Sequence, residues 1–256
     1  MQSTNVWYLP DITEWRDSFV KMIGKIHPYS DLCCRLAVQH CSIPEDNDVN
    51  ILDSILSEIK GYECDFIELM ACEFRKKYTF VRAVHASKPT DIESILNKGL
   101  SVFAVDGYCK MAETIFVNNS YPSITKEDVC RAVEKINNEH YGRVNKLFFF
   151  VTEFYKQCAH YSEFGSEFMR SVANNLDVKD QYVENLKEKG CSTIFLCNVP
   201  VKNISDKFLC DCLHVAISYL FNPSLEKSTP LKTKDVAISI DCGLSSSNIV
   251  SHHPFP

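Results

Sequence analysis

Glycine is scarce in this 256-residue chain. It has eight glycines, about 3% against a usual value near 7%, and no two of them lie closer than eight residues. Loops that bind phosphate need closely spaced glycines, because their backbone amides must approach the anion. The spacing therefore excludes a GxGxxG dinucleotide fingerprint, a Walker loop and a GxSxG nucleophile elbow.

Basic clusters and long apolar runs are also missing. The chain has 27 basic and 33 acidic side chains and a net charge of −6, without the lysine and arginine cluster that nucleic-acid backbones require. Its longest apolar run, LFFFV at residues 147–151, is far below the ~20 residues that span a bilayer. Its first residues lack the basic and apolar regions of a secretory signal. We expect no non-specific binding of nucleic acid through charge and no membrane segment, whereas a local contact to a nucleotide stays open.

Cysteine, in contrast, is abundant. Disulfide scaffolds belong to short secreted chains, so thirteen cysteines in a chain of this length predict reduced, mostly buried thiols and a cytoplasmic location. Two local groups contain side chains of the kinds that bind zinc: Cys210, Cys212 and His214, and Cys33, Cys34 and Cys41. No CxxC spacing occurs, and CDCLH lies in an apolar helical pattern. These features favour core packing, so we expect no metal.

The chain divides into a helical first section and a mixed remainder. Apolar residues make up 45% of the chain, enough for a substantial core. Residues 11–76 have helical periodicity, and residues 1–77 hold 13 acidic against 8 basic side chains. From residue 78 the pattern predicts strands at 78–87, 146–152, 192–201 and 235–241, with a short last strand in the C-terminal tail. Helices lie between them, so 78–256 is expected to be an α+β domain.

Several helix boundaries follow from capping residues. The first helix has an apolar stripe formed by Ile12, Trp15, Phe19, Met22 and Ile23. After the first strand, Pro89 is expected in the first turn of a short helix that Ser87 caps and Gly99 ends. A later amphipathic helix is expected to begin near Ser123 and Glu127.

The most informative segment is the first strand with the helix after it. The strand contains His85, Ala86 and Ser87. The helix after it has the pattern I-x-x-I-L-x-x-G-L, which runs from Ile92 through Gly99 to Leu100. This unit resembles the first NAD-binding motif of the ADP-ribosyltransferases related to diphtheria toxin and the poly(ADP-ribose) polymerases. In that family the strand ends in histidine, glycine and serine or threonine, so Ala86 replaces the glycine here. An ordinary strand-end histidine is the alternative interpretation of His85.

A second polar cluster follows the strand at 146–152. Residues 158–168 include a histidine, a tyrosine, two serines, two glutamates and one of the few glycines. The resemblance implies that a histidine holds the ribose, an aromatic ring stacks on nicotinamide, and a glutamate binds the ribose 2′-hydroxyl. We assign the ring to Tyr161 or Tyr108 and the glutamate to Glu167, which opens a helix after Gly165. A first-turn acid that the helix dipole favours is an equal interpretation of Glu167.

The resemblance implies a fold and an activity. The fold is an ADP-ribosyltransferase-like split β-sandwich with flanking helices and the N-terminal helical section. The activity is NAD-dependent mono-ADP-ribosyl transfer to a macromolecule or nucleotide, with NAD as substrate. A carboxylate is required because nicotinamide loss leaves a cationic ribose. Residues 1–77 would then bind a protein partner or restrain a toxin-like activity.

Two other functions remain open on the same scaffold. Transfer to water would make the protein an NAD glycohydrolase. A catalytically silent protein that senses a nucleotide or binds a partner is the third, and the alanine at position 86 favours it.

Overall fold

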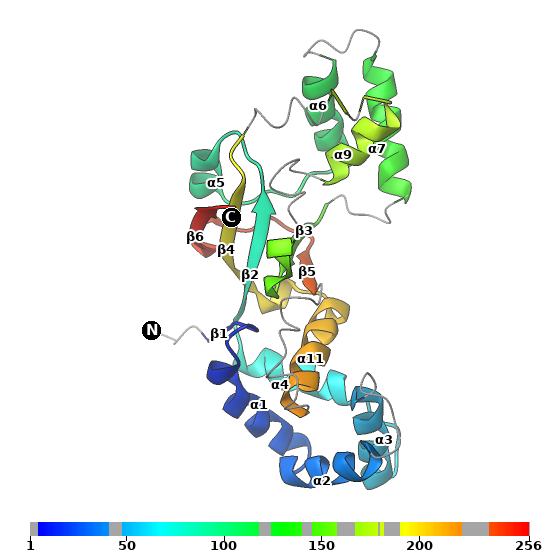
Figure 1. Cartoon of the computed structure of the whole chain (residues 1–256), viewed down its shortest axis with the longest axis vertical. Helices are drawn as coiled ribbons and strands as arrows, with labels where there is room; N and C mark the ends of the chain where they lie inside the picture. The colour runs from blue at the N-terminus through cyan, green and yellow to red at the C-terminus, as the bar shows by residue number, and fades with distance from the viewer. Residues whose placement is uncertain are drawn as a thin grey trace. The chain divides into compact units, whose positions relative to one another are not determined.

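A computed structural model gives the arrangement of the chain. It describes residues 5–40, 48–117, 124–139, 145–157, 167–178, 180–181, 190–221 and 236–255. The fold is mixed, with helices and an open sheet that is antiparallel apart from one short parallel pair, as expected for an α+β protein (Figure 1). None of the helices in these ranges combines the length and hydrophobicity needed to cross a membrane.

The elements of the first half are β1 (Val6–Trp7), α1 (Ile12–Ile26), α2 (Tyr29–His40), α3 (Asp48–Lys60), α4 (Phe66–Lys77), β2 (Phe80–Ser87), α5 (Ile92–Lys98), α6 (Val105–Phe116) and α7 (Lys126–Glu139). Those of the second half are β3 (Leu147–Phe150), η1 (Glu153–Gln157), α9 (Glu167–Asn175), β4 (Thr193–Pro200), η2 (Val201–Asn203), α11 (Asp206–Phe221), β5 (Ala237–Ile240), η4 (Ser246–Asn248) and β6 (Ile249–Pro254). Here η marks a short 3₁₀ helix.

The chain forms two compact units. The first comprises Met1–Ala83, Phe150–Phe154 and Val199–Ile238, and the second comprises Val84–Phe149, Tyr155–Asn198 and Ser239–Pro256. The first unit therefore contains the expected helical section together with two later segments.

The core of the first unit is aromatic. The ring centroid of Trp7 lies 6.2 Å from that of Trp15, 5.9 Å from Phe19 and 5.1 Å from Phe74, and all four side chains are buried. These rings join β1, α1 and α4. The predicted stripe of α1 is confirmed at its four described side chains, since Met22 and Ile23 on the same helix are buried as well. The side chain of Ile12 lies outside the described part.

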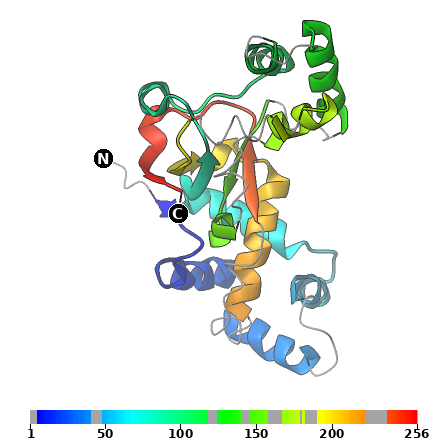
Figure 2. The same cartoon turned by 45° about the horizontal axis from the view of Figure 1, so that its top comes forward.

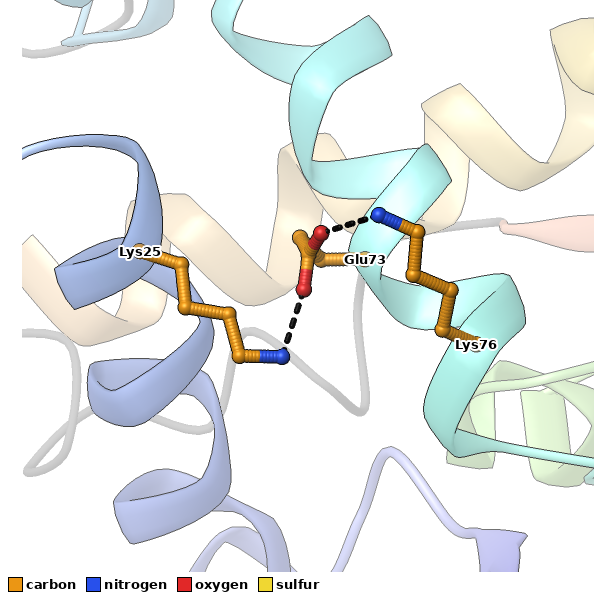
Figure 3. A network of polar contacts seen from close by, with 3 residues as sticks. All are labelled: Lys25, Glu73 and Lys76. Carbon is orange, nitrogen blue, oxygen red and sulfur yellow. Dashed lines mark hydrogen bonds and ion pairs between the residues drawn. The ribbon is translucent and has the colours of Figure 1, made fainter.

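Ion pairs and hydrogen bonds connect the helices of this unit. Figure 3 shows the Glu73 carboxylate of α4 between two ammonium groups: Lys25 of α1 at 2.6 Å and Lys76 of α4 at 2.5 Å. Arg75, also on α4, donates to the carbonyl oxygens of Val201 and Ile204 just before α11. Helix α11 packs along α4 and α3, as Figures 1 and 2 show.

The sheet has the order β5-β3-β2-β4-β6, and β1 pairs in parallel with the start of β2. Strand β6 runs antiparallel to β4, with Thr193 opposite Pro254 and a register shift between Leu196 and Cys197. The strands expected at 78–87, 146–152, 192–201 and 235–241 are confirmed as β2, β3, β4 and β5. The short last strand expected in the tail is β6. Strand β1 was not predicted.

The connection after β2 corrects two capping predictions. Helix α5 begins at Ile92, and its N-cap is Asp91, whose carboxylate accepts from the Ser94 amide at 2.9 Å. Ser87 is the last residue of β2 and does not cap the helix, and Pro89 precedes it. The predicted end is confirmed, since the Gly99 amide donates to the Ile95 carbonyl.

A separate helical cluster belongs to the second unit. Helices α6, α7 and α9 bury one apolar core that includes Phe116, Val133 and Phe168, and Figure 1 shows the three helices gathered together. Helix α6 was not predicted. The start of α7 has a reciprocal cap between Thr125 and Asp128 in place of the predicted Glu127. Ser123 lies outside the described residues.

Candidate functional site

His85 lies near the end of β2 and is partly buried. Its Nδ1 atom is 2.9 Å from the carbonyl oxygen of Phe148 in β3. A carbonyl oxygen can only accept a hydrogen bond, so Nδ1 carries the proton and donates. The ring is held further by Phe149, whose centroid is 5.6 Å from the imidazole. The neighbouring strand thus fixes both the orientation and the tautomer of His85.

The charge state of His85 follows from its surroundings. Burial lowers the pKa of the imidazole below its usual 6.5, and the Phe148 carbonyl offsets part of that effect. The ring is therefore neutral at pH 7. With the proton on Nδ1, the Nε2 atom has a free lone pair and accepts a hydrogen bond. His85 is suited to bind a hydroxyl group.

The burial pattern of β2 explains why His85 is not enclosed in the core. Val81 and Ala83 are buried at the start of the strand, whereas Val84 and Ala86 are buried at its end. Alternate residues of a strand point to opposite faces, so the buried face changes between Ala83 and Val84. His85 then lies on the less buried face of the second half, and Ser87 shares that face.

Two of the other expected site residues, Tyr108 and Glu167, lie on helices of the helical cluster. Glu167 is the first residue of α9, where the positive end of the helix dipole favours an acid. The ring of Tyr108 in α6 is 4.3 Å from Phe168 and 5.7 Å from Phe103, and burial raises the pKa of its phenol. The structure therefore brings Tyr108 to the segment that contains Glu167. Tyr161 lies outside the described residues.

Two locations thus hold the expected residues. His85 contacts β3, through Phe148 and Phe149. Tyr108 packs against the core that α6, α7 and α9 share, and Glu167 is the first residue of α9. Sequence reasoning missed the two phenylalanines. It predicted the strand that contains them from its apolar run, but the run gives no sign of which strand lies beside it.

The cysteine groups differ in burial. On α11, Cys212 is buried, Cys210 is partly buried and His214 is exposed. In α2, Cys33 is partly buried and Cys34 is exposed, and Cys41 lies outside the described part. Within the described ranges, no group of three His, Cys, Asp or Glu side chains could hold a metal ion.

Reduced and mostly buried thiols were a further expectation. No disulfide joins the cysteines for which the structure gives a position. Of the eleven cysteines that the structure describes, four are buried and four are partly buried, while Cys34, Cys72 and Cys191 are exposed.

Comparisons with protein-family models, with curated proteins and with solved structures find no match to this chain.

Proposed function

We propose that the protein is an NAD-dependent mono-ADP-ribosyltransferase built on an ADP-ribosyltransferase-like split β-sandwich. The order of its parts supports this proposal: a strand ending in His85, Ala86 and Ser87, then helix α5, then Gly99 at the helix end. These parts follow one another in the sequence that the family resemblance implies. The acceptor of ADP-ribose would be a macromolecule or a nucleotide.

The main support is the tautomer of His85. A ribose hydroxyl is a hydrogen-bond donor, and the neutral imidazole offers Nε2 as acceptor because Phe148 holds the proton on Nδ1. A protonated histidine could only donate. Ser87 lies on the same face of β2 and offers a second polar group there.

The proposed chemistry is substitution at the ribose carbon that bears nicotinamide. The bond from this carbon to the nicotinamide nitrogen breaks, and its electron pair leaves with nicotinamide. The acceptor then attacks the same carbon and loses a proton. A carboxylate stabilises the cationic ribose between these events, and we assign this role to Glu167. Tyr161 or Tyr108 would stack on the nicotinamide ring.

One observation favours a second candidate, a silent protein that binds NAD without cleaving it. The contacts that the structure gives His85 come from β3, and Glu167 begins α9 in the helical cluster. The silent candidate requires only that His85 bind a hydroxyl group, and it assigns no role to a carboxylate. Ala86, which is 8% exposed, also favours this candidate, because its methyl group narrows the approach of nicotinamide to the backbone where the family has glycine.

The test is incubation of the full chain with NAD, with nicotinamide release and mass addition measured together. We expect His85→Ala and Glu167→Gln to lower nicotinamide release by about 100-fold or more. Glu139→Gln, a charge-matched change at an exposed position of α7, should leave the release unchanged. Release without mass addition would identify a glycohydrolase. NAD binding without release would identify the silent protein. Release that neither site variant lowers would refute the assignment.

A further inference from the structure

Helices α6 and α7 each place a cysteine at the core that they share. Cys109 of α6 is buried in this core, and Cys130 of α7 packs against it as a partly buried residue. Both cysteines are free thiols in the structure. Neither thiol has a role in the proposed NAD chemistry.

An ion pair fixes the register of the two helices. The Lys126 ammonium nitrogen at the start of α7 is 2.9 Å from the Glu113 carboxylate near the end of α6. The two helices pack along each other, and the start of the second meets the end of the first, so they are antiparallel. Cys130 follows Lys126 by four positions, and Cys109 precedes Glu113 by four. Because residues four apart share a helix face, this register places Cys109 opposite Cys130, one turn from the ion pair.

Small side chains beside the two cysteines allow the helices to approach closely. Ala112 of α6 and Ala132 of α7 are buried in the shared core. The axes of packed helices lie about 8–10 Å apart, and Cα atoms lie ~2.3 Å from each axis. Facing Cα atoms are therefore separated by roughly 3.5–5.5 Å. A disulfide bridges Cα atoms about 4.4–6.8 Å apart, so cysteines that face each other across such a pair of helices can be joined.

The two thiols differ in their access to reagents. Burial raises the pKa of the Cys109 thiol to about 12, and a hydrogen bond with the Cys130 thiol adds to this rise. The thiolate is the reactive form of cysteine, so Cys109 stays protonated and unreactive at pH 7. Cys130 is partly exposed. It is therefore the thiol of this pair that a small molecule in solution reaches first.

We propose that Cys109 and Cys130 form a reversible disulfide that joins α6 to α7 when the protein reacts with a small disulfide of the glutathione type. The Cys130 thiolate attacks one sulfur of the small disulfide, whose S–S bond breaks and releases one thiolate. Cys109 then loses its proton, attacks the Cys130 sulfur and expels the second thiolate. The two cysteines lose two electrons, and the small disulfide becomes two thiols that take up the two protons. This proposal is independent of the NAD site.

The bridge would stabilise the helical cluster. The two cysteines are 21 positions apart in the sequence, and a cross-link over such a segment lowers the conformational entropy of the unfolded chain. We expect oxidation to lower the equilibrium constant for unfolding of this cluster by about 30- to 300-fold. The urea midpoint of the oxidised protein should therefore exceed that of the reduced protein.

The test uses the full chain, first reduced and then held in buffers of rising ratio of oxidised to reduced glutathione. Free thiols are blocked with N-ethylmaleimide, and the monomer is isolated on a non-reducing gel. Trypsin, which cleaves after lysine and arginine, releases each cysteine in a peptide that contains no other: residues 99–110 include Cys109, and residues 127–131 include Cys130. We expect mass spectrometry to find these two peptides joined in the oxidised monomer and separate after reduction.

Two single variants predict different products. Cys109→Ala should leave one glutathione attached to Cys130, because no second thiol is present to expel it. Cys130→Ala should leave Cys109 unmodified, because its burial keeps glutathione away. Cys34→Ala and Cys72→Ala change exposed cysteines and are the matched controls. Both controls should keep the cross-link and the rise in urea midpoint.

Three results would overturn the proposal. The first is that peptides 99–110 and 127–131 stay separate in the folded protein at the highest ratio of oxidised glutathione. The second is a cross-link that forms only in urea, because the two thiols would then meet only in the unfolded chain. The third is the joining of Cys130 to a cysteine other than Cys109, which would contradict the register that the ion pair fixes.

Discussion

Replacement of Gly99 by alanine should destabilise the second unit strongly. Gly99 ends α5 with φ 89° and ψ −173°, a region of backbone conformation that is essentially restricted to glycine. A Cβ atom at this position would lie 2.1 Å from the carbonyl oxygen of Leu244 and 2.8 Å from the amide nitrogen of Ser246. The added methyl group therefore faces both a strained backbone and a collision with fixed backbone atoms.

The free-energy cost has two parts. The backbone conformation costs about 1–3 kcal/mol for a residue with a side chain. To avoid the collision, Leu244 must move, and its carbonyl accepts from the Leu100 amide at 2.9 Å while its own amide donates to Leu100 at 2.8 Å. Each lost hydrogen bond costs about 0.5–1.5 kcal/mol. With both hydrogen bonds lost, the sum is a decrease of about 2–6 kcal/mol in the free energy of unfolding.

The chain supplies two controls for this change. Gly61 has φ 72° and open space around its Cβ position, so Gly61→Ala should cost only about 1–2 kcal/mol. Gly24 lies inside α1, and no atom lies within 4 Å of the position its Cβ would take. Gly24→Ala should therefore raise the free energy of unfolding by about 0.5–1 kcal/mol. Urea unfolding followed by circular dichroism measures all three. A Gly99→Ala protein as stable as Gly24→Ala would refute the reasoning.

Three further predictions concern other contacts. Arg75→Lys should lower the free energy of unfolding by about 2 kcal/mol, because one ammonium group cannot donate to the carbonyls of Val201 and Ile204 and to the Asp206 carboxylate together. Urea titration followed by tryptophan fluorescence measures this change. An unchanged urea midpoint would contradict the prediction. Lys25 and Lys76 lower the pKa of the Glu73 carboxyl below 4.5. The stabilisation of the fold by these ion pairs is therefore present above pH 4.5 and is lost as the pH falls through the lowered pKa. The difference in urea midpoint between wild type and Glu73→Gln should therefore shrink from pH 7 to pH 3, and a constant difference would exclude the ion pairs as its cause. NAD affinity, measured by calorimetry, should stay constant from pH 8 to pH 6.5 and fall at lower pH as His85 becomes protonated; a fall that begins above pH 6.5 would show that the imidazole is not held neutral.

Long periodic segments made much of the fold predictable. The largely apolar segment 192–201 predicted strand β4, and in the structure buried and partly buried residues alternate along all eight positions of the strand. Strand β1 has two residues, too few to show a period, and pairs with Phe80 and Val81 more than 70 residues later. Its existence depends on a tertiary contact, so sequence periodicity could not predict it.

At the site, too, features set by neighbouring residues in the sequence were predictable, whereas features set by contacts between distant residues were not. The order of β2, α5 and Gly99 was predictable because the residues are contiguous. The cap of α5 was not, because Ser87 and Asp91 are both good N-caps and only the start of the helix at Ile92 decides between them. The partner of His85 is 63 residues away, and its identity depends on the order of strands in the sheet.

The most direct test of the account is the nitrogen NMR spectrum of His85 during titration with NAD. Labelling the histidines with ¹⁵N and comparing the spectrum with that of His85→Gln identifies its two ring signals. A neutral ring with the proton on Nδ1 is expected before NAD is added. Addition of NAD should shift the Nε2 signal and leave Nδ1 in place. Ring signals of His85 that do not move at saturating NAD would contradict the proposed site.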